Sequence, residues 1–163
     1  MVGQVQTDGK VGEQLISHMT KVYRCLKAIM REEAVRQELS LTQYIALRML
    51  DVHGSLTMSE LHHYLDITQG AATTVVDKLI ARGLVMRIAL PADRRVVIVQ
   101  NTNAGTQMVQ RVLAGTQEQI DEILQVLPAD EHDEVVRGFA HFARVLDLSP
   151  LNSLAVEEAA CKN

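Results

Sequence analysis

Apolar residues recur at intervals of three and four over the first part of the chain, which is the spacing of one helix face. This series consists of Leu15, Met19, Val22, Leu26 and Ile29. It predicts a helix over residues 10–35. Ser40 and Gln43 then have the S-x-x-Q spacing of a capping box, so we expect a second helix to begin there and to end near Gly54.

Residues 56–102 predict helix, turn, helix and hairpin in succession. Thr57 and Glu60 form a second capping box, and Thr68 is placed to cap a helix that ends before Gly83. Residues 84–90 and 96–100 are rich in Val, Ile and Leu, and Pro-Ala-Asp-Arg-Arg separates them. That pattern predicts a two-stranded hairpin with Pro91 in its loop.

The helical period returns at residue 103, breaks at Pro128 and continues to Leu146. We therefore predict a mainly α protein with a small β-hairpin wing. A winged helix-turn-helix at residues 40–102 would be flanked by an N-terminal helix at 10–35 and by C-terminal helices at 103–147, with a tail at 148–163. The flanking helices have apolar faces, so either they pack only on one another or they also form a dimer interface. A dimer is favoured if the helix-turn-helix binds DNA, because one recognition helix covers only a few base pairs and a two-fold dimer reads a palindrome.

Composition and charge narrow the class of protein. The chain has 163 residues, 47% of them apolar, and a net charge of −4, so overall charge does not favour nucleic-acid binding. Basic residues are concentrated locally instead, and a local potential steers a polyanion to the contact face. Between residues 78 and 95 they are Lys78, Arg82, Arg87, Arg94 and Arg95, opposed only by Asp93.

Cys25 and Cys161 have neither disulfide-framework nor metal-ligand spacing, which favours a reducing compartment. The N-terminus has no signal-peptide core, and no apolar run is long enough to span a membrane. We expect a cytoplasmic protein without a membrane partner. GxSxG, HExxH, P-loop, GxGxxG and CxxC motifs are missing, so we predict neither an enzyme nor a bound cofactor.

The start of the predicted recognition helix carries side chains suited to reading bases. Gln bonds adenine bidentately, and Thr offers a hydroxyl or a methyl group to a base edge. The candidate base contacts are Thr68, Gln69, Thr73 and Thr74. Gly70 and Ala72 would allow close approach to DNA. Thr68 could instead serve only as the helix cap.

The middle of the chain resembles the MarR family of bacterial winged-helix transcriptional regulators, which act as homodimers. The matching segments, in order, are Gln43–Leu47, Leu56–Leu61, Thr74–Leu79, Arg82–Arg87, Pro91–Arg95 and Thr102–Gly105. The chain departs from the family pattern at His62, where a small residue is usual, and at Asn101, where Leu is usual.

The resemblance implies that Asp93 fixes Arg95 for insertion into the minor groove, while Arg94 contacts phosphate. A solvated hairpin tip is the ordinary alternative for these three residues. Lys78, Arg82 and Arg87 would be at most positioning contacts on the DNA backbone, although Arg87 could equally pair with an acid across the fold.

The resemblance also implies a small-molecule effector, either an aromatic acid or a phenol. It would bind between the dimerisation helices and the DNA-reading lobe. The candidate ligand contacts are His18, Tyr23, Tyr44, Arg48 and His62. Ordinary packing or a structural ion pair is the alternative for each of them.

The leading hypothesis is a ligand-responsive repressor that binds a pseudo-palindromic operator as a homodimer. A redox sensor is less favoured, because the family's peroxide-sensing branch has its cysteine one turn before a tyrosine, where Met19 stands here, and Cys25 follows Tyr23 on another face. A metal sensor is less favoured because His53, His62 and His63 lack ligand spacing. The last alternative is a winged helix that contacts only proteins, for which the basic wing would have no use.

Overall fold

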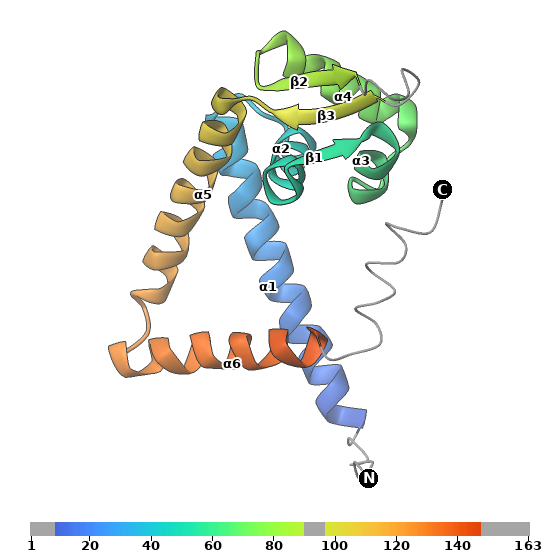
Figure 1. Ribbon diagram of the computed structural model, residues 1–163. Coiled ribbons are helices and arrows are strands. Elements are labelled where there is room, and N and C mark those ends of the chain that lie inside the picture. The colour runs from blue at the N-terminus through green and yellow to red at the C-terminus, as the bar shows by residue number, and fades with distance from the viewer. Residues whose placement is uncertain (1–8, 90–96, 148–163) are drawn as a thin grey trace.

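The computed structural model describes residues 9–89 and 97–147, and it places six helices and three strands there. Three long helices, α1 (Gly9–Arg36), α5 (Asn103–Leu124) and α6 (Ala129–Asp147), form an open triangle (Figure 1). Helices α1 and α5 converge on a lobe built from the remaining elements, and α6 runs from the far end of α5 back across α1. The predicted mainly α class is confirmed.

The lobe contains α2 (Leu41–His53), α3 (Met58–Tyr64) and α4 (Gln69–Ala81), and both predicted capping boxes form. The Ser40 hydroxyl accepts from the Gln43 amide at 3.2 Å, and the Ser40 amide donates to Gln43 Oε1 at 2.8 Å. Thr57 and Glu60 repeat the arrangement at 3.1 and 2.7 Å. These bonds satisfy amides that no helical carbonyl can reach, so they fix where each helix begins.

Strands β1 (Ser55–Thr57), β2 (Val85–Ala89) and β3 (Val97–Asn101) form one antiparallel sheet in the order β1-β3-β2. The predicted hairpin, β2 and β3, is therefore confirmed, and β1 adds a third strand that the sequence pattern did not predict. Leu56 pairs with Val99 on one side of β3, and Arg87 pairs with Val99 on the other. Strand β1 could not be predicted, because three residues are too few to show an alternation of apolar and polar positions and its partner strand lies more than forty residues later in the sequence.

The core lies within the lobe and at the converging ends of α1 and α5. It consists of aliphatic side chains and one tyrosine, among them Tyr44, Leu47, Leu50, Leu61, Val76, Leu79, Val99, Val109 and Val112. Ala34, in the last turns of α1, and Leu39 belong to the same cluster. Because these residues come from both flanking helices and the lobe, one continuous core joins the lobe to the ends of α1 and α5.

The far side of the triangle is almost unpacked in the single chain. Every residue from Gly9 to Ala28 is exposed, and α6 has no buried residue. The turn between α5 and α6 is nevertheless held locally, because His132 Nε2 donates to the carbonyls of Leu124 at 2.7 Å and Leu127 at 3.2 Å. A carbonyl can only accept, so this ring nitrogen must carry the proton.

Candidate nucleic-acid interface

The N-terminal turn of α4 lies at the surface of the lobe and presents polar side chains. Thr68 caps the helix, because its hydroxyl accepts from the Ala71 amide at 3.3 Å. Gln69 and Gly70 follow it and are exposed. A Cβ at Gly70 would meet no atom of the described residues within 4 Å, so they leave the surface open above the helix at this point. This turn could approach the edge of a base pair without rearrangement.

The two threonines one turn further along differ in accessibility. Thr74 is exposed, whereas Thr73 is half-buried. Their hydroxyls donate to the carbonyls of Gly70 at 3.1 Å and Gln69 at 3.0 Å. A hydroxyl that donates to the helix in this way can still accept, so each threonine is suited to an amino group on a base edge.

Ala72 is fully buried, which corrects its assignment to the DNA-contacting set. It shares the inward face of α4 with Val76 and Leu79. In a sequence, an alanine is compatible with either face of a helix. Only the packing of α4 on α2 and α3 shows that Ala72 faces the core. Its small size serves the core and not the approach to DNA.

The basic residues near α4 have different partners. Arg87 on β2 pairs with Asp77 on α4 at 2.7 Å, as the alternative interpretation of Arg87 expected. Both side chains are about half exposed, so the pair orients the guanidinium without removing it from solvent. Lys78 is exposed and lies in the last turn of α4. Arg82 donates to the backbone beyond α1, as detailed below.

The wing residues Asp93, Arg94 and Arg95 lie outside the described residues. The strands on either side of them are described, and their last pair is Ala89 with Val97. The roles of these three residues stay predictions from the family resemblance.

The five effector candidates do not converge in the single chain. His18 and Tyr23 line a cavity of about 500 Å³ between α1 and α6, together with Phe139 and Phe142. His62 lines a different hollow of about 410 Å³, beside His63, Asp66 and Thr68, where the two imidazole centroids lie 4.0 Å apart.

Tyr44 and Arg48 on α2 have the alternative roles that were expected for the effector candidates, namely ordinary packing and a structural ion pair. Tyr44 is fully buried in the core, which corrects its prediction as a stacking surface for a ligand. Burial raises the pKa of its phenol, opposed by the positive charge of Arg48 and assisted by Asp51. Arg48 itself pairs with Asp51 at 3.3 Å on the same helix.

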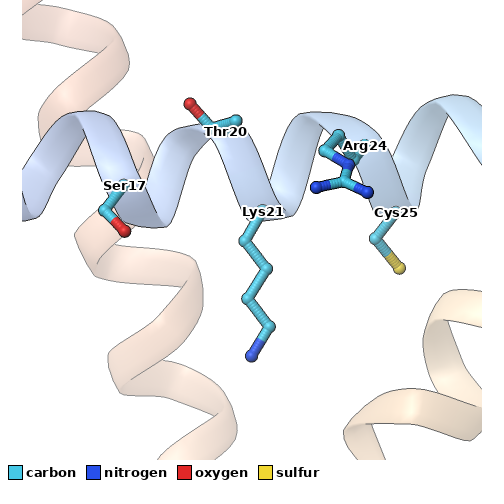
Figure 2. A pocket seen from close by; sticks show the side chains of 5 residues that line it. All are labelled: Ser17, Thr20, Lys21, Arg24 and Cys25. Carbon is cyan, nitrogen blue, oxygen red and sulfur yellow. The ribbon is translucent and has the colours of Figure 1, made fainter.

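Cys25 lies on the exposed side of α1 and therefore takes no part in core packing within the single chain. A hollow of about 610 Å³ is lined there by Ser17, Thr20, Lys21, Arg24 and Cys25. Figure 2 shows the side chains of Ser17, Lys21 and Cys25 projecting from the same edge of the helix.

Across residues 9–89 and 97–147, no group of three or more His, Cys, Asp or Glu side chains is arranged to hold a metal ion. The three neighbouring histidines are separated by their packing, since His53 stacks on Tyr64 at 4.7 Å between centroids while His62 faces His63. No helix in this part of the chain is both long and apolar enough to cross a membrane.

A capped, exposed recognition helix behind a three-stranded winged sheet defines a winged helix-turn-helix protein. The MarR family model matches residues 39–97, which cover α2 to the start of β3. The chain belongs to the MarR family of helix-turn-helix transcriptional regulators, and its class is a transcriptional regulator and not an enzyme.

Three curated relatives resemble it in sequence. The transcriptional regulator MhqR of Bacillus subtilis is 28% identical over 69% of this chain and 78% of its own. The regulator YpoP of the same organism is 30% identical over 62% and 74%. The transcriptional repressor NicR of Pseudomonas putida is 31% identical over 63% and 65%.

Two solved structures share the fold. Apo MarR from E. coli superposes with a TM-score of 0.71 at 23% identity, over 78% of this chain and 95% of that one. NadR in complex with 4-hydroxyphenylacetate superposes with a TM-score of 0.58 at 19% identity, over 89% and 99%.

Proposed function

We propose that the protein is a ligand-responsive repressor, which binds a pseudo-palindromic operator as a homodimer in the cytoplasm. The observation that carries the proposal is the N-terminal end of α4, whose first two turns expose Gln69 and Thr74 next to the exposed cap Thr68 and the open surface at Gly70. An exposed, polar recognition-helix start of this kind suits the major groove, which is wide enough to admit a helix.

Homodimerisation is supported by the uncovered apolar faces of α1 and α6. Ile16 and Tyr23 on α1 are 67% and 61% exposed, and Phe139 on α6 is 56% exposed. Large apolar surfaces of this kind on a monomer mark an interaction site. A second copy would supply the missing cover, and a two-fold axis would present two recognition helices to two half-sites.

Release by an aromatic acid or phenol is supported by the cavity between α1 and α6. Its lining is mainly apolar and includes the rings of Tyr23, Phe139 and Phe142, with His18 at hand for a carboxylate. NadR, which shares the fold, was crystallised with 4-hydroxyphenylacetate. A ligand bound there would change the operator affinity by its differential affinity for the two spacings of the lobes.

Selection from a random duplex library at two salt concentrations tests the DNA-binding role. We expect a palindrome to be enriched and its affinity to fall as salt rises. Gln69→Ala should lose about tenfold or more in affinity and relax preference at one position of each half-site, as expected for a lost bidentate contact. Lys78→Ala is the matched control, because a lost phosphate contact weakens all sequences equally.

Sedimentation equilibrium tests the dimer. Phe139→Ser should shift the protein towards the monomer, whereas His141→Ser, on an exposed part of the same helix, should not. Titration of the operator complex with 4-hydroxyphenylacetate and related phenols then tests release. An absence of palindrome enrichment at low salt would contradict the proposal and favour a winged helix that contacts proteins.

A further inference from the structure

The recognition helix ends at a junction with both of the flanking helices that converge on the lobe. Arg82, the C-terminal cap of α4, donates from Nη1 to the Glu38 carbonyl at 2.6 Å and from Nη2 to the Gln37 carbonyl at 3.2 Å. These carbonyls belong to the turn that ends α1, 44 and 45 residues earlier in the sequence. One guanidinium thus binds the end of the recognition helix directly to the end of α1.

The turn beyond α1 is shaped to receive this guanidinium. Glu38 has a positive φ of 58°, and the Leu39 amide returns to the Ala34 carbonyl at 2.8 Å. The two carbonyls that accept from Arg82 lie in this turn at the C-terminal end of α1, where the negative end of the helix dipole favours a cation. Arg fits the site because its planar fork can donate to two acceptors at once.

The last helical turn of α1, which directly precedes this turn, is bonded to α5. Glu33 is only 4% exposed, and its carboxylate accepts from Gln119 Nε2 and pairs with Arg36 at 3.1 Å. Gly115 lies against that carboxylate, since a Cβ there would collide with it. The end of α1 is therefore held by α5 on one side and by α4 on the other.

The start of α5 is bonded to the residues that follow Arg82. The Thr102 hydroxyl donates to the Gly83 carbonyl at 2.7 Å, and the Thr102 amide donates to the Leu84 carbonyl at 3.0 Å. The residues that directly follow Arg82 are thus fixed to the start of α5. The end of α4 is therefore bonded to the end of α1 through Arg82 and to the start of α5 through Gly83, although α4 itself carries the candidate base contacts.

We propose that Arg82 is a positioning residue that sets the half-site spacing which the dimer accepts, a proposal that rests on the proposed function. It touches no base. Mis-spaced half-sites can be bound only if each lobe turns relative to the dimerisation helices, and each added base pair rotates a half-site by about 34°. The free energy of this rotation depends on the contacts that join α4 to α1. Removing the Arg82 link lowers the penalty against wrong spacings while each recognition helix still reads its half-site.

The test compares operators whose half-sites are separated by the selected spacing or by two base pairs more or fewer. We expect the full-length Arg82→Ala protein to lose about tenfold of its discrimination between spacings, the size of one good charge-assisted interaction. Its affinity for a single half-site should be unchanged. Arg82→Lys, which keeps the charge but lacks the fork, should be intermediate. Lys78→Ala, which removes a cation from the same helix, should weaken all spacings equally.

Other results would overturn the inference in distinguishable ways. Unchanged discrimination in Arg82→Ala, with an intact thermal transition, would show that the core alone positions α4. An equal loss at every spacing and at the half-site would show that Arg82 contacts DNA. If Arg82→Ala does not fold, Arg82→Lys and Arg82→Gln decide by the same measurement. A wild-type protein that binds no duplex would refute the proposed function itself.

Discussion

Two glycines at the starts of helices are expected to respond in opposite ways to the same substitution. Gly105 lies in the first turn of α5, where a Cβ would collide with the Leu84 carbonyl oxygen and lie 3.1 Å from its carbon. Leu84 cannot yield easily, because its carbonyl accepts from the Thr102 amide. A Cβ at Gly70, near the start of α4, would have no neighbour within 4 Å among residues 9–89 and 97–147.

The magnitude follows from two opposing effects. Alanine favours a helix over glycine by about 1 kcal/mol. Overpacking against atoms that cannot rotate away costs about 1–3 kcal/mol, and contact with backbone belongs at the upper end. Gly105→Ala should therefore be destabilised by about 2 kcal/mol net, which lowers Tm by about 4–8 °C for a chain of this size. Gly70→Ala should match the wild type or exceed it slightly.

Thermal unfolding followed by circular dichroism at one fixed protein concentration measures both variants. The fixed concentration matters because assembly would itself raise Tm. A Gly105→Ala protein that is as stable as Gly70→Ala would refute the reasoning, since it would mean that α5 can move off Leu84 without cost.

Three further predictions concern single side chains. Burial raises the pKa of the Tyr44 phenol in the folded protein. The stability that this phenol contributes is therefore complete below its pKa of about 10 in the unfolded chain, and it is lost as pH rises through the higher pKa of the folded state. Unfolding measured at increasing alkaline pH should show this loss in the wild type and not in Tyr44→Phe. Asn101 donates to the Leu47 carbonyl at 2.9 Å, and its buried Oδ1 has no hydrogen-bond partner in the described part of the chain. Urea unfolding at pH 7 should therefore show Asn101→Asp destabilised by about 2 kcal/mol or more, with partial recovery in acid, and Asn101→Leu nearly neutral. In the same assay, Ser40→Ala should lower the free energy of unfolding by about 1 kcal/mol and Ser40→Gly by only a few tenths of that. Equal stability of Ser40→Ala and the wild type would contradict the capping box.

The sequence alone determined where the helices begin and end. Ser40, Thr57 and Thr68 cap helices where predicted, and Gly83 follows the end of α4 at a positive φ of 68°. These signals are readable because each rests on bonds between residues three or four apart, which form wherever the local sequence permits them. The order of elements and the spacing of the motifs then sufficed to indicate the family.

Only the tertiary structure decided which side chains face the core, the solvent or one another. Ala72 and Tyr44 were assigned to binding surfaces and are buried, and strand β1 exists only because β3 lies beside it. The bonds from Arg82 to the turn after α1 span more than forty residues. Such contacts depend on how helices pack together, and no local pattern encodes them. For that reason the sequence located the recognition helix, while the folded chain showed what holds it in place.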